Sequence, residues 1–394
     1  MEHAQHGEAF DRIIDRRDTD SIKWSHYDRD VLPMWVADMD FTSPEPVLAA
    51  LRERIDHGVF GYPVPASALR RAVVERLHRL YQWDVTEESV VFSPNVVVGF
   101  NLAARAFTSP GDGLLIQTPI YFPILRVPGN ANLQAQHLEL TRCQDGYYEI
   151  DFDRLERTMT RKTSLFILCN PHNPVGRAFT RQELERMAEA CVRHNTIICA
   201  DEIHADFVYD GKAHLPIASI GPEIEQRTIT LIAPTKTYNL AGLSCAIAVI
   251  PNRELREGFV EAKRGLVSSP GALAYTAALA AFQHGSDWLA GLLSYLQTNR
   301  DVLTTYVAEH LPELHISPIE ATYLAWLDCR RAGIPGNPQE FFLRNGRVAF
   351  NDGAAFGPGG DGFVRLNFGC PRSVLLDGLD RMRRALDSRS SGAG

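Results

Sequence analysis

Lys236 is the residue of this chain whose surroundings point most directly to chemistry. It stands between two threonines, just after the apolar run at residues 229–233. A lysine held partly out of water at the end of a rigid strand has a lowered pKa, and its neutral amine can attack a carbonyl group to form a Schiff base. The neighbouring hydroxyl of Thr235 could donate a hydrogen bond to a cofactor phosphate. Because a lysine beside threonines is more often a solvated loop residue, the interpretation depends on three other segments.

A carboxylate ends a second apolar run. The run at residues 197–200 leads directly into Asp201, and a carboxylate at the end of a buried strand is costly unless it meets a cation or a good donor. A protonated pyridinium nitrogen is such a partner. An alternative is a metal site formed by Asp201, Glu202, His204 and Asp206. No second cluster with recognised metal-ligand spacing stands out in the sequence, which disfavours a metal site. Glu202 and Asp206 could also simply be acids of a surface loop.

The other two segments carry an amide and a guanidinium. Asn173 lies in a doubled Asn-Pro loop that follows the apolar run at residues 164–168 and precedes a capping box at 180–183. This places Asn173 at the carboxyl end of a predicted strand, where open α/β sheets bind ligands, although Asn-Pro also initiates ordinary turns. Arg365 lies on a short, otherwise apolar strand. Its planar guanidinium suits a carboxylate ligand, or it could pair with an internal acid at a domain junction.

Taken together and in this order, these segments resemble the fold-type I pyridoxal-phosphate enzymes, the aspartate-aminotransferase superfamily, over nearly the whole chain. A closer resemblance is to the MalY/PatB-type carbon–sulfur β-lyases, which are cystathionine β-lyase-like. It rests on the stretch at residues 32–41, the turn at 60–63, the Lys236 segment and His204. Aminotransferases usually have tyrosine at the position of His204 and a phosphate-binding arginine at that of Ser244. Both differences favour the lyase branch.

The resemblance implies an α/β fold of the PLP-dependent transferase type (the aspartate aminotransferase fold). A large PLP-binding domain with a mostly parallel seven-stranded sheet is expected at residues 44–285, and a smaller α+β domain with a connector helix at 286–387. Residues 1–43 are expected to pack on the small domain. The small, polar tail at 388–394 is expected to be disordered. The alternation of predicted strands and helices from about 94 to about 250 is itself typical of a parallel, doubly wound sheet.

The resemblance also implies roles around one pyridoxal 5'-phosphate. Lys236 would form the Schiff base and carry the α-proton of the substrate, Asp201 would pair with the pyridine nitrogen, and Tyr121 would stack on the ring. The residues implied in cofactor binding are Lys236, Asp201, Asn173, His204, Tyr121, Asn95, Val96, Thr235 and Tyr62. Those implied in substrate binding are Arg365, which would bind the α-carboxylate, with Ala37, Trp35 and Asn173.

Two of these implied roles concern the cofactor phosphate. Asn95 and Val96 would offer backbone N–H groups to it at a helix N-terminus, where free donors and the helix dipole favour an anion. Tyr62 would reach the phosphate of a neighbouring subunit, which implies a homodimer.

The implied activity is α,β-elimination of L-cystathionine, L-cysteine or related S-conjugates to a thiol, pyruvate and ammonia. An aminotransferase on the same scaffold is the alternative, since a fold does not determine its function. A regulatory protein that keeps pyridoxal phosphate for structure is a third, less favoured possibility, because Lys236, Asp201, Asn173 and Arg365 are all present.

Composition restricts the remaining possibilities. The 394-residue chain has a formal charge of −8 and no basic stripe, which argues against nucleic acid as a partner. No apolar run reaches membrane-spanning length, and the first residues lack the apolar core of a secretory signal. The seven cysteines include no C-x-x-C pair and indicate buried thiols in a reducing compartment. We therefore expect a cytoplasmic enzyme acting on a small amino acid.

Overall fold

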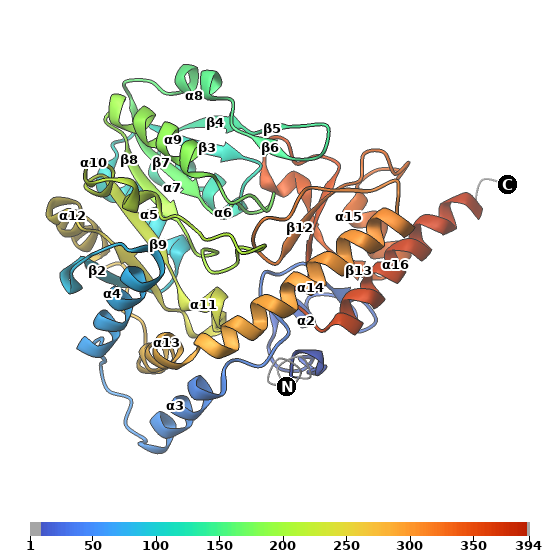
Figure 1. Ribbon diagram of the computed structural model, residues 1–394, viewed down its shortest axis with the longest axis horizontal. Coiled ribbons are helices and arrows are strands. Elements are labelled where there is room, and N and C mark those ends of the chain that lie inside the picture. Colours follow the sequence, from blue (N-terminus) through green and yellow to red (C-terminus); the bar gives the residue numbers. More distant parts are fainter. Residues whose placement is uncertain (1–8, 392–394) are drawn as a thin grey trace.

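A seven-stranded sheet forms the centre of the computed structural model, which describes residues 9–391 (Figure 1). Its order is β2-β10-β9-β8-β7-β3-β4, and within the described residues only β10 runs against the others. The strands are β2 (Val90–Ser93), β3 (Gly113–Thr118), β4 (Gln134–Glu139), β7 (Thr163–Cys169), β8 (Ile197–Asp201), β9 (Thr228–Ile232) and β10 (Ala246–Val249). The expected mostly parallel seven-stranded sheet is confirmed.

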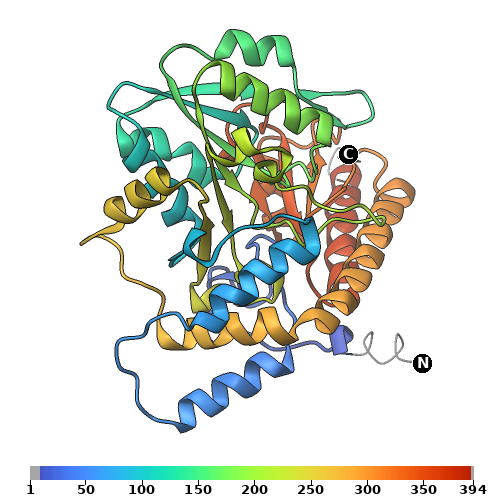
Figure 2. The ribbon, with the colours of Figure 1, turned by 60° about the vertical axis from the view of Figure 1, so that its left-hand side comes forward.

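Helices cover both faces of this sheet because successive strand residues point to opposite sides. Leu114 and Ile116 face α5 (Val96–Phe107) and α12 (Arg253–Lys263), whereas Leu115 faces α8 (Phe152–Thr158) and α9 (Arg181–Arg193). The predicted capping box is confirmed: Thr180 and Glu183 cap the start of α9 through each other's backbone N–H groups. At the β2–β10 end of the sheet, α4 (Ser67–Tyr81) and α13 (Ala272–His284) pack on one face, in the same cluster as Phe92 and Val249, and α3 (Glu45–Asp56) packs against α13 (Figure 2).

The smaller unit is built on a four-stranded antiparallel sheet of order β11-β12-β15-β14. The strands are β11 (His315–Ile316), β12 (Leu324–Asp328), β14 (Asn351–Asp352) and β15 (Phe363–Asn367). The long helices α14 (Ser286–His310) and α16 (Arg372–Ser391) pack against each other beside it (Figure 1). The proposed domain boundary at residue 286 coincides with the start of α14.

The segment before residue 44 lies against this smaller unit. Strand β1 (Leu32–Pro33) pairs in parallel with β13 (Val348–Ala349), and Phe10 and Met34 belong to the same buried cluster as Leu324. Residues 1–8 of the predicted N-terminal segment lie outside the described part of the chain.

The short elements complete the chain. They are α2 (Ile22–Ser25), α6 (Phe122–Leu125), α7 (Val127–Ala131), β5 (Thr141–Arg142), β6 (Tyr148–Glu149), α10 (Pro222–Glu225), α11 (Pro234–Thr237) and α15 (Pro338–Phe341). Within residues 9–391, none of the helices combines the length and the apolar composition that a membrane span requires.

The expectation of a disordered tail from residue 388 was wrong at its start, because α16 continues to Ser391. The Ser388 hydroxyl donates to Ala385 O, and Arg389 Nε donates to Leu386 O. Arg389 also pairs with Glu313 at 3.6 Å. These contacts supply partners that the polar composition did not reveal, and residues 392–394 lie outside the described range.

Candidate active site

The carboxyl ends of three neighbouring strands bring together the residues that the sequence singled out. Strand β8 ends at Asp201, the loop that contains Asn173 follows β7, and α11, which carries Lys236, follows β9. Because β7, β8 and β9 are parallel neighbours, their carboxyl ends meet at one edge of the sheet. Tyr121 joins them from the end of β3, where its backbone N–H donates to Asn173 O at 3.0 Å.

Lys236 points its amine towards the N-terminal segment. Its Nζ donates a hydrogen bond to Ala37 O, which also accepts one from the Tyr323 hydroxyl at 3.0 Å. Burial of the amine lowers the pKa of Lys236 to about 8; the charge of Arg365 lowers it too, while Asp38 and Asp201 oppose the shift. The amine is therefore available as a nucleophile and a base near neutral pH, as the sequence pattern suggested.

Asp201 is a buried carboxyl group without a cation in contact. Only 2% of the residue is exposed, and within the described residues its carboxyl accepts one hydrogen bond, from Ile203 N at 3.2 Å. Burial raises the pKa of Asp201 to about 7, although this hydrogen bond and Lys236 oppose the increase. A group in this condition favours a positively charged partner.

His204 is buried beside the same strand end. Its Nδ1 has no hydrogen-bond partner within the described residues, and its ring meets the Tyr323 ring edge-on at 5.7 Å. Burial lowers the pKa of His204 to about 3, assisted by the positive charges of Lys236 and Arg365. The imidazole is therefore neutral, and its free nitrogen can hydrogen-bond a ligand.

Arg365 carries a charge that no acid neutralises within the described residues. Its Nη1 donates to Asn173 Oδ1 at 3.0 Å, and its Nη2 donates to Trp35 O at 3.0 Å and to Asn351 Oδ1 at 2.6 Å. Its Nε is buried and has no hydrogen-bond partner in the described part of the chain, and burial lowers the pKa of Arg365 to about 10. All its partners in the described residues are neutral oxygens, so the alternative that Arg365 pairs with an internal acid was wrong. The arrangement suits an incoming carboxylate.

Comparison with known proteins places the chain in a family. Residues 29–382 match the family model described as aminotransferase class I and II. The chain belongs to that family. It is 39% identical over 385 residues to cystathionine beta-lyase PatB of Bacillus subtilis (strain 168), covering 96% of this chain and 99% of that protein. It is 32% identical over 391 residues to protein MalY of Escherichia coli (strain K12), covering 96% and 98%.

A solved structure shows the same relationship in three dimensions. Cystalysin from Treponema denticola, which contains a pyridoxal 5'-phosphate cofactor, superposes with a TM-score of 0.93 at 31% sequence identity. The match covers 96% of this chain and 99% of that one. The expected PLP-dependent transferase fold is confirmed for this member of the aminotransferase class I and II family.

The acids beside Asp201 have partners that the sequence did not reveal. Glu202 is buried, accepting from Ile217 N at 3.1 Å and lying 2.9 Å from His214 Nε2. Asp206 accepts from the Thr237 hydroxyl at 2.6 Å and pairs with Arg76 of α4. Interpreting either as a solvated loop acid was therefore wrong. Among the described residues, no group of three potential ligands is arranged to hold a metal ion.

Side chains from both units hold the N-terminal segment over Lys236. Asn367 Nδ2 donates to Val36 O at 2.6 Å and to Asp38 O at 2.7 Å. From the other side, Asn239 Nδ2 donates to Met39 O at 2.9 Å and to Phe41 O at 2.8 Å. The Ala37 carbonyl is thus fixed between strand β15 and the loop of Lys236 in this family member.

A buried charge cluster supports the same segment from behind. Lys23 is 1% exposed and pairs with Asp40 at 2.6 Å, while Arg16 pairs with Asp40 at 2.7 Å and with Asp38 at 2.6 Å. The Trp35 indole donates to Lys23 O at 3.2 Å, so Trp35 presents its backbone carbonyl, not its indole nitrogen, to Arg365.

The residues implied in phosphate binding fall into two groups. Asn95 caps α5, its side chain accepting from Val98 N at 2.8 Å, and Val96 begins that helix; Thr235 lies one residue before Lys236. Tyr62, by contrast, is fully exposed, so a single chain does not bring it to the site.

Proposed function

We propose that this protein is a PLP-dependent carbon–sulfur β-lyase, which eliminates a thiol from L-cystathionine, L-cysteine or related S-conjugates and yields pyruvate and ammonia. The observation that carries the proposal is the combination of an amine with a pKa near 8, a buried carboxyl without a cation, and an arginine without an acid. PatB and several other similar proteins are named cystathionine beta-lyases. His204 and Ser244 also match the lyase branch.

The residues at the strand ends fit pyridoxal 5'-phosphate. The uncompensated carboxyl of Asp201 suits a protonated pyridine nitrogen, and Lys236 supplies an amine for its aldehyde. The Asn173 amide oxygen accepts from Arg365, which leaves the amide N–H groups for a ring oxygen. When bound, the cofactor supplies an electron-withdrawing ring that makes the substrate Cα–H bond acidic.

Each residue of the site has its own role in the reaction. Arg365 binds the substrate α-carboxylate in a bidentate manner, with Asn173 beside it, and thereby orients the Cα–H bond. Lys236, whose pKa near 8 keeps a substantial neutral fraction at neutral pH, takes the proton from Cα and returns a proton to the leaving sulfur. Asp201 would hold the pyridine nitrogen of the cofactor in its protonated form. Water completes the reaction by releasing pyruvate and ammonia.

The phosphate would lie at the N-terminus of α5, near Asn95, Val96 and Thr235. The N–H groups of the first helical turn have no partners within a helix and favour an anion. An arginine is absent at position 244, where Ser244 stands, so the hydroxyl of Tyr62 of a second subunit would supply a further hydrogen bond.

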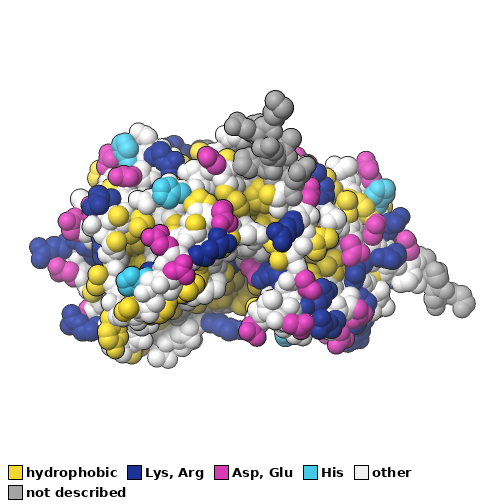
Figure 3. Space-filling view, turned by 90° about the horizontal axis from the view of Figure 1, so that it is seen from below, with side chains coloured by type: hydrophobic (Ala, Val, Ile, Leu, Met, Phe, Trp, Pro, Cys, Tyr) yellow, Lys and Arg dark blue, Asp and Glu magenta, His cyan; other side chains and the backbone are white. Residues whose placement is uncertain are grey.

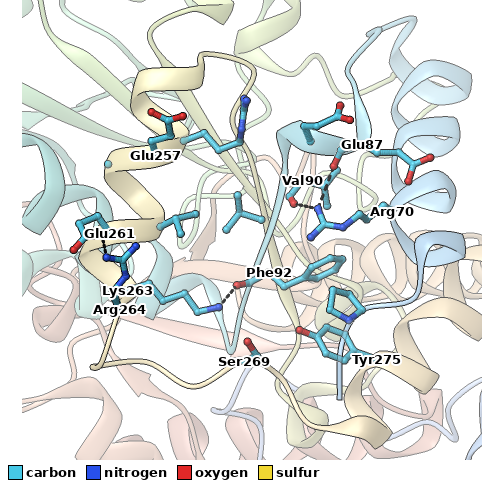
Figure 4. A pocket seen from close by; sticks show the side chains of 16 residues that line it. Arg70, Glu87, Val90, Phe92, Glu257, Glu261, Lys263, Arg264, Ser269 and Tyr275 are labelled. Carbon is cyan, nitrogen blue, oxygen red and sulfur yellow. Dashed lines mark hydrogen bonds and ion pairs between the residues drawn. The ribbon is translucent and has the colours of Figure 1, made fainter. Parts of the chain in front are cut away.

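A homodimer is part of this proposal. Tyr62 and its neighbours Phe60 and Val64 are exposed apolar side chains on the loop between α3 and α4. Pro65 of the same loop borders a cavity of about 970 Å³ between Arg70 and Glu261 (Figure 4). Helix α3 lies at the lower edge of Figure 1, and hydrophobic side chains gather around a hollow on the face seen from below (Figure 3). A second copy of the chain would cover the exposed loop between α3 and α4 together with this face.

Mixing two inactive variants tests the shared site. In a dimer of one Lys236→Ala subunit and one Tyr62→Ala subunit, one site keeps both groups if Tyr62 acts across the interface. Activity should therefore return on mixing. If Tyr62 acts within its own chain, neither site is intact and mixing restores nothing.

The lyase reaction itself has a direct test. Purified protein with pyridoxal phosphate is given L-cystathionine without any keto acid, and pyruvate and free thiol are measured together with the Lys236→Ala control. Equal amounts of both products from the parent protein, and none from the variant, support the lyase. If no pyruvate forms from L-cystathionine alone and amino-group transfer appears only after a keto acid is added, the aminotransferase alternative is established instead.

The cysteines support a cytoplasmic location. All seven are unpaired, and only Cys143 is not fully buried. Free thiols of this kind are typical of a reducing compartment.

A further inference from the structure

A polar cavity of about 770 Å³ lies where the two units meet, apart from the proposed active site. One wall is the β5–β6 hairpin, which extends from the large sheet towards the smaller one (Figure 1). The opposite wall is formed by β11 with the turn before it, and by the end of β12. Its volume is in the range of small-molecule sites.

Guanidinium groups from both walls converge on one carboxylate. Arg142 of the hairpin lies 3.3 Å from Asp328 at the end of β12, and Arg330 pairs with the same carboxylate at 2.7 Å. Arg142 and Arg330 also lie 5.8 Å and 4.7 Å from the ring of Phe363, which holds the two cations close together. Arg331, also in the cavity wall, makes no hydrogen bond or ion pair within the described residues.

The acids that line the cavity are fewer than its arginines. Asp328 is already shared by two arginines, and Glu313 is engaged by Arg389 at 3.6 Å. Asp145 is near enough to His315 to influence it, but forms no ion pair within the described residues. Among the residues that line the cavity, Arg142, Arg330 and Arg331 carry three positive charges against the two negative charges of Asp328 and Glu313, a surplus of one.

The hydrogen-bonding groups left over are donors. Arg142 Nε is buried and has no partner among residues 9–391, although Nη2 of the same residue lies 3.1 Å from His315 Nδ1. Burial lowers the pKa of His315, and so does Arg142, which keeps the imidazole neutral. With Nδ1 accepting from Arg142, the remaining proton of His315 is on Nε2. A ligand that only accepts hydrogen bonds and carries negative charge complements this set.

We propose that the cavity binds a small multivalent oxyanion, either a phosphate compound or a polycarboxylate, separately from the cofactor phosphate. Such a ligand bridges the hairpin and the end of β12 and so ties the two units together. Because it does not use Lys236 or any residue of the cofactor site, the proposal stands or falls independently of the lyase activity.

Titration calorimetry of the holoenzyme, saturated with pyridoxal phosphate and at constant ionic strength, tests this site. Pyrophosphate and citrate are the probes, and binding of one but not the other identifies the preferred class of anion. We expect saturable binding that weakens about tenfold or more in Arg142→Gln and in Arg331→Gln. Arg344→Gln, which removes an equal charge from an exposed pair with Glu340 elsewhere, should bind like the parent.

Two results would overturn the proposal. One is the absence of saturable binding of either probe at millimolar concentration. The other is equal affinity in the parent and in Arg331→Gln, a variant that should fold normally because Arg331 makes no polar contact with the described residues. As a positional check, hydrogen exchange at residues 141–149 should slow when the anion binds.

Discussion

The lowered pKa of Lys236 can be measured directly in the apoprotein. The perturbation is a change of pH from about 6 to about 11, across both the shifted value near 8 and the ordinary lysine value near 10.5. At pH 7.5, a lysine with a pKa of about 8 is neutral in roughly a quarter of the molecules, against roughly one in a thousand for an ordinary lysine. The amine of Lys236 should therefore react with an acylating reagent on the order of a hundredfold faster than a solvated lysine.

Competitive labelling with a trace of acetic anhydride provides the assay. Mass spectrometry of the digested protein gives the extent of Lys236 acetylation at each pH, with an acetylated lysine amide in the same tube as the solvated reference. The apparent pKa of Lys236 should be near 8 and should return to the reference value when the protein is unfolded in urea. A midpoint near that of the reference in the folded protein would refute the argument that burial controls this amine.

Three further outcomes follow from the contacts at the site. Burial raises the pKa of Asp201 to about 7 in the folded apoprotein, whereas the unfolded chain has the ordinary value near 4. Between these values the folded state keeps a proton that the unfolded state has lost, so the free energy of unfolding measured in urea should fall as pH rises from about 4 to about 7. Asp201→Asn should remove that slope. Asp206→Ala leaves the buried Arg76 charge without its partner, so the free energy of unfolding should drop by ~3–5 kcal/mol. An unchanged urea midpoint would contradict this. Arg365→Gln should raise the KM for L-cystathionine about tenfold or more while the cofactor absorbance persists, and an unaltered KM would exclude carboxylate binding by Arg365.

The strand-end residues could be predicted because their signal is local. Each of Lys236, Asp201 and Asn173 follows a short apolar run, and parallel strands bring such positions to one edge whatever the distant sequence contains. The capping box at Thr180 was visible for the same reason, since its partner Glu183 is three residues away.

The partners of these residues could not be predicted, because they come from distant parts of the chain. Asn351 holds Arg365 only because β14 pairs with β15. Lys23 looks like an ordinary surface lysine in sequence, and its burial depends on Asp40 folding back over it. Tyr62 is fully exposed in this chain, so the contact with a second subunit that we propose for it stays a prediction.

The position of the N-terminal segment has a consequence for how the protein is made. The segment that ends at Phe41 leaves the ribosome well before the residues that hold it, because Trp35 and Val36 are bound by Arg365 and Asn367, about 330 residues later. At roughly 5–20 residues per second, that interval lasts about 15–65 s. All strands of the large sheet, by contrast, have been synthesised by Val249. The strands that lead to Asp201 and Lys236 are therefore complete well before Arg365 is synthesised, and the segment around Trp35 and Val36 is without its final partners during that interval.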